Sequence, residues 1–143
     1  MSARTNIRNA IGNAITGAAV VPTANLVRGR DRTLASTSFP ACAVYAVTED
    51  VEIRTLAPNY REQYRTLEVS VDYFTAVTGT TILDDLLDNG SSSVEAAVLA
   101  DVTLGGNCRD LHLTRVQYVI EPDEERQWGV ARHTFQAIYL TQD

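Results

Sequence analysis

The stretch 64–75 alternates strictly between two kinds of side chain, and this pattern limits the folds open to the chain. Leu67, Val69, Val71 and Tyr73 fall on one side, and mostly polar residues fall between them. A period of two is typical of an antiparallel strand that is buried on one face only. We therefore expect a long strand at about 63–77 within a sheet that has one covered and one open face.

Three further segments have strand character. The run 39–47, with Pro40 at its mouth, is the most uniformly apolar in the chain and predicts a strand at about 40–47 buried on both faces. It is far too short to cross a bilayer. The segments 111–121 and 128–141 are joined by a short acidic link that contains a proline, which is typical of a hairpin.

Two segments show helical spacing. Residues 3–19 repeat apolar side chains every three or four positions, and residues 80–101 do the same. The polar run 89–93 interrupts the second pattern, but the apolar stripe keeps its phase, so we favour one continuous helix. The predicted fold class is α+β: a mixed, mostly antiparallel four-stranded sheet covered by two main helices, in a single domain spanning 1–143.

The connection 20–38 is unusually long for a compact domain, and its tip is rich in arginine. Three interpretations stay open for this tip: a solvated loop, a clamp on the carboxylates of a neighbouring subunit, or a contact with DNA phosphates. We predict that its arginines contact a subunit or partner, and that nearby acids are candidate partners. The predicted interface residues are Arg28, Arg30, Arg32, Glu49, Asp50 and Glu52.

Charge is distributed unevenly along the chain. All twelve basic residues are arginine. Residues 1–32 hold five Arg and one Asp, a net charge of +4, and residues 33–143 hold seven Arg and seventeen acids, a net charge of −10. An acidic body argues against wrapping nucleic acid, which needs a basic face. A basic end joined to an acidic body favours contact between copies of the chain.

Residues that could perform chemistry are few and badly spaced. A metal or a Cys–His nucleophile pair could be built only from Cys42, Cys108, His112 and His133, and none has Cys-x-x-Cys or His-x-x-x-His spacing. No phosphate-binding or dinucleotide-binding fingerprint occurs. We expect two reduced thiols, no metal, no cofactor and no enzymatic activity. The first residues contain no apolar run of the signal-peptide kind, so we do not expect secretion.

Three local features, in this order, carry a resemblance to a known family. The first is Phe39-Pro40-Ala41-Cys42-Ala43-Val44-Tyr45, close to a Phe-Pro-Ala-apolar-Ala-Val-Tyr strand. The second is the helix end 94–101 followed by Leu104-Gly105-Gly106, and the third is the final strand that opens with Trp128 after an acidic turn. With these features the chain resembles the tail terminator proteins of long-tailed bacteriophages, the family of the lambda minor tail protein U. The arginine-rich tip and His133 depart from the family pattern.

The resemblance implies a structural virion protein rather than an enzyme. Members of the family are mixed α/β domains that form hexameric rings. Each ring caps the tail tube at its final length, stops tube polymerisation and provides the docking surface for the head connector. The implied partners are further copies of the chain, the tail tube protein and the connector, with genomic DNA passing through the lumen without specific binding. The implied location is the neck end of the virion tail, after assembly in the host cytoplasm.

Two other functions stay open at this point. One is a head-side connector or stopper, built from similarly small subunits, or another tail-completion protein. The other, of a different class, is a small ligand-binding or enzymatic α/β domain that uses the Cys42, Cys108, His112 and His133 set.

Overall fold

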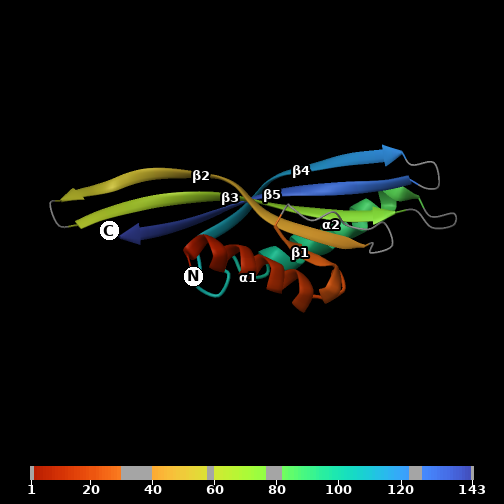
Figure 1. Ribbon diagram of the computed structural model, residues 1–143, viewed down its shortest axis with the longest axis horizontal. Helices are drawn as coiled ribbons and strands as arrows, with labels where there is room; N and C mark the ends of the chain where they lie inside the picture. The colour runs from red at the N-terminus through yellow and green to blue at the C-terminus, as the bar shows by residue number, and fades with distance from the viewer. Residues whose placement is uncertain (1, 30–39, 58–59, 77–81, 123–126, 143) are drawn as a thin grey trace.

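The computed structural model describes residues 2–29, 40–57, 60–76, 82–122 and 127–142. Figure 1 shows a long, twisted sheet with helices beneath it. Along the chain the elements are α1 (Ala3–Gly17), a 3₁₀ turn η1 (Thr23–Asn25), β1 (Leu26–Arg28), β2 (Ala41–Ala57), β3 (Tyr60–Ala76), α2 (Leu83–Leu99), β4 (Asp110–Pro122) and β5 (Gln127–Gln142). The α+β class and the order of the main elements agree with the sequence prediction.

In the described part of the chain the sheet has five strands rather than the predicted four, in the order β1-β2-β3-β5-β4. The additional strand lies inside the connection 20–38, where no strand was predicted. β1 pairs in parallel with β2, Leu26 opposite Cys42 and Arg28 opposite Val44. A strand of three residues is too short to show a period of two, so no sequence pattern predicts it. It forms because its backbone pairs with the edge of β2.

Strand β2 is much longer than predicted. It continues past residue 47 to Ala57 and pairs antiparallel with β3 along its whole length, from Ala41 opposite Phe74 to Ala57 opposite Tyr60. The prediction of burial on both faces is right only for Ala41–Val44, because Val47 is already exposed. The predicted strand ended at residue 47, but the segment 48–52 continues it, because the alternating strand β3 supplies a hydrogen-bonding partner.

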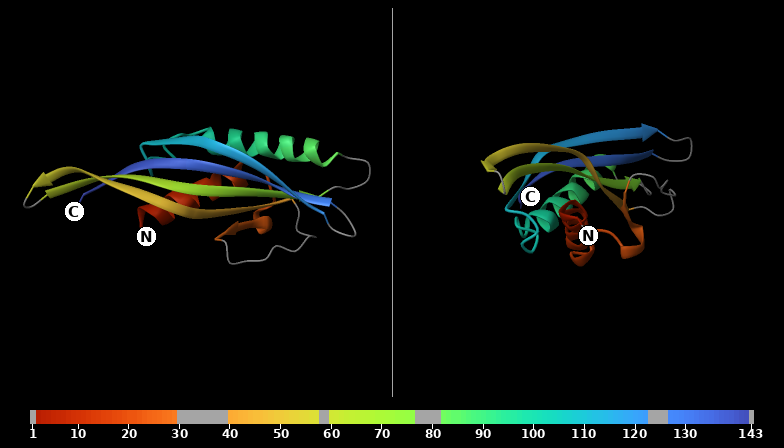
Figure 2. Two further views of the ribbon diagram at one scale, coloured as in Figure 1. Left: turned by 90° about the horizontal axis from the view of Figure 1, so that it is seen from above. Right: turned by 60° about the vertical axis from the view of Figure 1, so that its left-hand side comes forward.

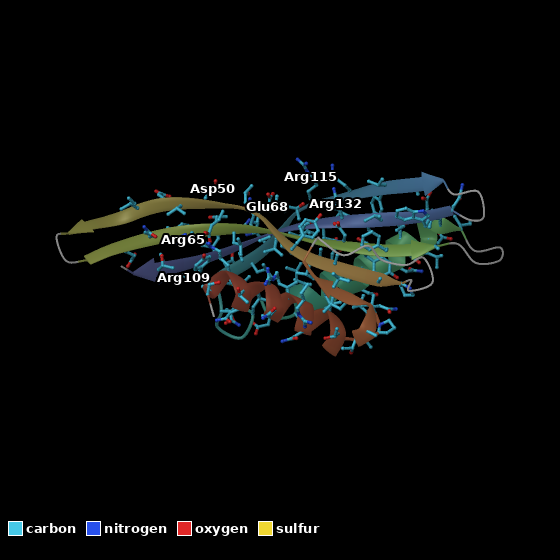
Figure 3. All side chains as sticks on the ribbon, in the orientation of Figure 1. Asp50, Arg65, Glu68, Arg109, Arg115 and Arg132 are labelled. Atoms are coloured by element: carbon cyan, nitrogen blue, oxygen red, sulfur yellow. The ribbon has the colours of Figure 1, made fainter. Side chains whose placement is uncertain are left out.

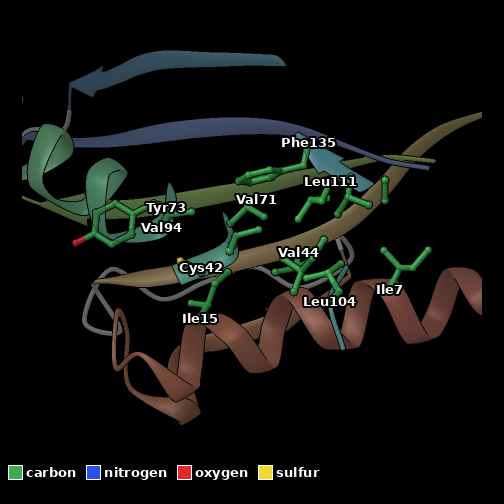
Figure 4. Close-up of a cluster of buried hydrophobic side chains, with 14 of the residues drawn as sticks. Ile7, Ile15, Cys42, Val44, Val71, Tyr73, Val94, Leu104, Leu111 and Phe135 are labelled. Atoms are coloured by element: carbon green, nitrogen blue, oxygen red, sulfur yellow. The ribbon is translucent and has the colours of Figure 1, made fainter. Parts of the chain in front are cut away.

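One face of the sheet is covered by both helices, as the two views in Figure 2 show. Helix α1 packs on β1 and β2, and α2 packs on β3, β5 and β4. The inward residues of α1 recur at the predicted spacing: Ile7, Ile11 and Ile15 are fully buried. They belong to the same buried cluster as sheet residues such as Cys42, Val71 and Phe135, which Figure 4 shows. The apolar face predicted for β3, made by Leu67, Val69, Val71 and Tyr73, is buried as expected.

Helix α2 is continuous through the polar run 89–93, as predicted, although it begins at Leu83 rather than at 80. Two small residues in this run lie on its buried side. Gly90 packs directly over the ring of Tyr73, where a Cβ atom would come within 2.1 Å of Cε1. Ser91 is also buried and contacts β5. The interruption in the apolar pattern is therefore a site of close helix–sheet packing and not a break.

The strands reach beyond the helices at one end of the molecule. There β2, β3 and the end of β5 form an arm with no helix beneath it, at the left of Figure 1. Neither of the two helices in the described part of the chain has the length and apolar character needed to span a membrane.

Candidate assembly surfaces

Arg28 lies in β1 and not at the tip of a loop. Its Nη2 donates to the Asn13 side-chain oxygen of α1 at 2.7 Å, although the side chain remains exposed. Arg30 and Arg32 lie outside the described residues. The contact of these arginines with a neighbouring subunit therefore stays a prediction.

Glu49 belongs to an internal cluster, and this limits its use as an interface residue. Its Oε2 accepts from Arg4 Nε at 2.7 Å and from Arg65 Nη1 at 2.9 Å, and its Oε1 accepts from the hydroxyl of Tyr139. Burial, together with the hydrogen bond to Glu49, raises the pKa of Tyr139, so the phenol keeps its proton and donates. The Glu49 side chain is only 11% exposed. Glu49 ties the first turn of α1 to the sheet.

Asp50 and Glu52 lie on the opposite face of the same strand. Their partners across the strand pair are Thr66 and Tyr64, which point away from the helices. Both acids are exposed, and within the described residues neither makes an ion pair or a side-chain hydrogen bond. With Glu68 they form an acidic strip on the open face, part of which is labelled in Figure 3. Asp50 and Glu52 therefore remain available for a partner.

An ion pair on the open face, between the buried Asp72 and the exposed Arg132, was not predicted. Asp72 is only 4% exposed, and Arg132 of β5 reaches it with Nε at 2.9 Å and Nη2 at 3.3 Å. The Tyr45 hydroxyl donates to the same carboxylate at 2.9 Å, and Ser70 Oγ lies 3.2 Å from its other oxygen. The group joins β2, β3 and β5. In the sequence Asp72 is one polar residue among several in an alternating strand, and no local signal separates it from its solvated neighbours.

His133 is fully buried and has a partner for each ring nitrogen. Nδ1 lies 3.2 Å from the carbonyl oxygen of Val71, and Nε2 lies 2.8 Å from Ser91 Oγ. Because a carbonyl can only accept, Nδ1 carries the proton and Nε2 accepts from the Ser91 hydroxyl. Burial lowers the pKa of His133, which favours this neutral form. The residue fastens α2 to the sheet.

The four residues weighed for metal or nucleophile chemistry do not form a site in the described part of the chain. No group of three or more His, Cys, Asp or Glu side chains there is placed to hold a metal ion. Cys42 and Cys108 are both free and buried, and burial raises the pKa of Cys42 to about 12. His112 is exposed and pairs with Gln136 at 3.1 Å. The thiol of Cys42 is therefore poorly suited to act as a nucleophile.

A shallow groove of about 910 Å³ runs between the outer sides of α1 and α2. Its walls are mainly small side chains, among them Ala14 and Ala97. Asp101, at its edge, caps the following turn by accepting from the backbone N–H of Thr103 and of Gly105. The groove offers little polar chemistry.

The exposed apolar side chains gather on two strands. The described part of the chain exposes eight large apolar side chains, and three of these lie on β2 and three on β4. They are Val47, Val51 and Ile53 on β2, and Tyr118, Val119 and Ile120 on β4. Both strands have an outward edge, β4 as the last strand of the sheet and β2 wherever β1 does not cover it. Apolar side chains on open strand edges are a common feature of protein–protein contact surfaces.

Comparison with known proteins identifies no family for this chain. No family model matches the sequence, and no curated protein matches it. Among solved structures, a chain described as part of the virion of a native gene transfer agent particle is similar over 94% of both chains, with 11% sequence identity and a TM-score of 0.48.

Proposed function

We propose that this chain is a structural protein of a tailed phage or phage-like particle, a tail terminator whose copies close into a ring on the end of the tail tube. The observation that carries the proposal is the order of the three motif-bearing segments. In the fold, the described part of the first segment opens β2, the second ends α2 and leads into the following turn, and the third lies in β5. The three segments therefore lie in a strand, at a helix end and in the final strand, in the order on which the resemblance is based.

The surfaces are in keeping with a protein that works by assembly. Within the described residues the sheet is open at both edges, and those edges carry most of the exposed large apolar side chains. A closed ring needs one patch of each subunit to fit a different patch of the next. Two unlike edges on one sheet meet that demand.

In this proposal the ring acts by covering the end of the tube. One face binds the last ring of tube subunits, so that no further subunit can add, and the other face receives the head connector. No bond is made or broken, and the free energy of association does the work.

The experiment is to measure the oligomeric mass by native mass spectrometry, alone and with the tail tube protein of the same particle. We expect a ring, hexameric by the resemblance, either directly or on contact with the tube. In electron micrographs, adding the protein to growing tubes should halt elongation. A chain that stays monomeric in the presence of tube protein, and leaves tube length unchanged, would refute the proposal.

The head-side connector or stopper is the second candidate. It is separated from the first by the same assay, because a connector would bind the portal end of the head and leave tube growth unaffected.

A further inference from the structure

Two strand edges of this sheet are free and similar in length. β4 is the outermost strand and has 13 residues. On the other side β1 pairs with residues 42–44 of β2, and in the described structure no strand pairs with the outward edge of β2 over 47–57. Each free edge presents a row of backbone N–H and C=O groups that can pair with another strand.

The two edges differ in how well they are protected. Natural edge strands are usually blunted by charges, prolines or bulges. β4 has a bulge between Leu113 and Arg115 and ends at Pro122, but the segment 116–120 between them carries no charge. Tyr118, Val119 and Ile120 in this segment are 51%, 41% and 44% exposed. Among the described edges, the segment 116–120 is therefore the one best suited to pair with a strand of another chain.

Strand direction makes the two edges complementary. β2, β3, β5 and β4 lie side by side, and each is antiparallel to its neighbour. Because the number of these strands is even, β4 runs opposite to β2. Rotating a copy about an axis along the strands keeps their direction, so β2 of that copy meets β4 in antiparallel orientation. Repeating the rotation closes a ring with the same contact at every step.

We propose that β4 of each copy pairs antiparallel with the free edge of β2 in the next copy, with Val116 opposite Val51 and Arg115 opposite Glu52. This inference rests on the proposed ring and names its subunit contact. In this register, side chains that face the helices in one copy lie opposite side chains that face the helices in the next. Val51 and Val116 pair within their own sheets with Arg65 and His133, on the helix side.

The charges on the open face agree with this register. Arg115 pairs with Thr134 within its own sheet, so it points away from the helices, as Glu52 does. Arg115 is exposed and, like Glu52, makes no ion pair among the described residues. Figure 3 labels Arg115 on β4 and shows Asp50 farther along the sheet, on β2. Two unpaired charges of opposite sign on the two free edges are brought together only between copies.

A cysteine pair tests the contact directly. Opposed residues of an antiparallel pair have Cα atoms about 4.5–5.5 Å apart, within the range that a disulfide spans. The variant Val51→Cys/Val116→Cys, oxidised in the assembled state, should give a ladder of linked chains on a non-reducing gel. Val51→Cys alone and Val116→Cys alone should give none, and a mixture of the two single variants should give only dimers. Linked dimers from Val116→Cys alone would show β4 pairing with itself and would overturn the inference.

A charge exchange supplies an independent readout. Arg115→Glu should reduce the ring fraction in native mass spectrometry, and Arg115→Glu/Glu52→Arg should restore it. Arg109→Glu is the matched control, since Arg109 is exposed but precedes β4, and it should leave the ring unchanged. Circular dichroism of each variant verifies that the monomer remains folded.

The outcomes separate this contact from the function proposed above. A ring of the expected mass that gives no cross-link, and is unaffected by Arg115→Glu, overturns the strand pairing and leaves the terminator proposal standing. A cross-linked ring that does not halt tube growth supports the pairing and refutes the terminator proposal.

Discussion

Replacing Gly90 by alanine is a sharp test of how closely α2 approaches the sheet. In an exposed helix interior this change normally stabilises a protein by about 1 kcal/mol, because glycine loses more backbone entropy on folding. Here an added Cβ would lie 2.1 Å from Cε1, 2.3 Å from Cζ and 2.7 Å from Cδ1 of Tyr73. We therefore expect Gly90→Ala to destabilise the fold.

The size of the effect follows from these distances. Carbon atoms at rest are about 3.5–4.0 Å apart, so the ring edge or the helix would have to move by about 1.4 Å or more. Tyr73 is only 8% exposed and lies within the core cluster, which leaves it little room to move. Overpacking costs about 1–3 kcal/mol, and a contact as short as 2.1 Å belongs at the upper end, about 2–3 kcal/mol, which outweighs the entropic gain. We expect a net loss of about 1–2 kcal/mol in the free energy of unfolding.

Urea unfolding at one fixed protein concentration measures this loss. With an m-value of about 2 kcal/mol/M, the midpoint should fall by about 0.5–1 M. Gly17→Ala is the matched control, because an added Cβ there meets nothing within 4 Å, and its midpoint should stay unchanged or rise. In a Tyr73→Val background, where the ring is absent, Gly90→Ala should raise the urea midpoint instead of lowering it. A Gly90→Ala protein as stable as the parent, or more stable, would refute the close packing described here.

Three further predictions concern buried polar groups. Ser91→Ala leaves Nε2 of the buried His133 without a donor and should cost about 1–3 kcal/mol in urea unfolding, whereas Ser93→Ala, at an exposed position, should cost little. Because burial lowers the folded-state pKa of His133 below the unfolded value of about 6.5, the unfolded chain binds more protons below that pH. Stability should therefore fall as the pH drops from about 6.5 toward the folded-state pKa, by at most about 1.4 kcal/mol per pH unit, and a His133→Gln variant that folds should lack this part of the slope. Cys42, fully buried and with a pKa of about 12, should resist iodoacetamide in the native protein and react once urea unfolds it; rapid native labelling at this residue would contradict its placement.

The candidate contact surfaces were only partly accessible to sequence reasoning. The acidic segment 49–52 was recognised as a candidate partner, but its residues were treated alike. In the strand they alternate between faces, so Glu49 is drawn into a cluster with Arg4 and Arg65 while Asp50 and Glu52 stay exposed. Arg115 was not considered, because one arginine in a strand carries no local sign that its strand is the edge of the sheet.

The sequence by itself determined the type and order of the main elements and the inward faces of α1 and β3. The period of two in 64–75 and the three- and four-residue spacing of Ile7, Ile11 and Ile15 arise because one side of each element is buried. Such patterns are local and can be read without knowing what lies on the other side of the contact.

Only the tertiary structure decided which elements pair and which polar groups are buried. The parallel strand β1, the extension of β2 to Ala57, the Asp72–Arg132 ion pair and the Ser91–His133 hydrogen bond all depend on a partner distant in the chain. Strand pairing and buried polar contacts form between segments that the fold brings together, so a residue can be assigned to them only once its neighbours in space are known.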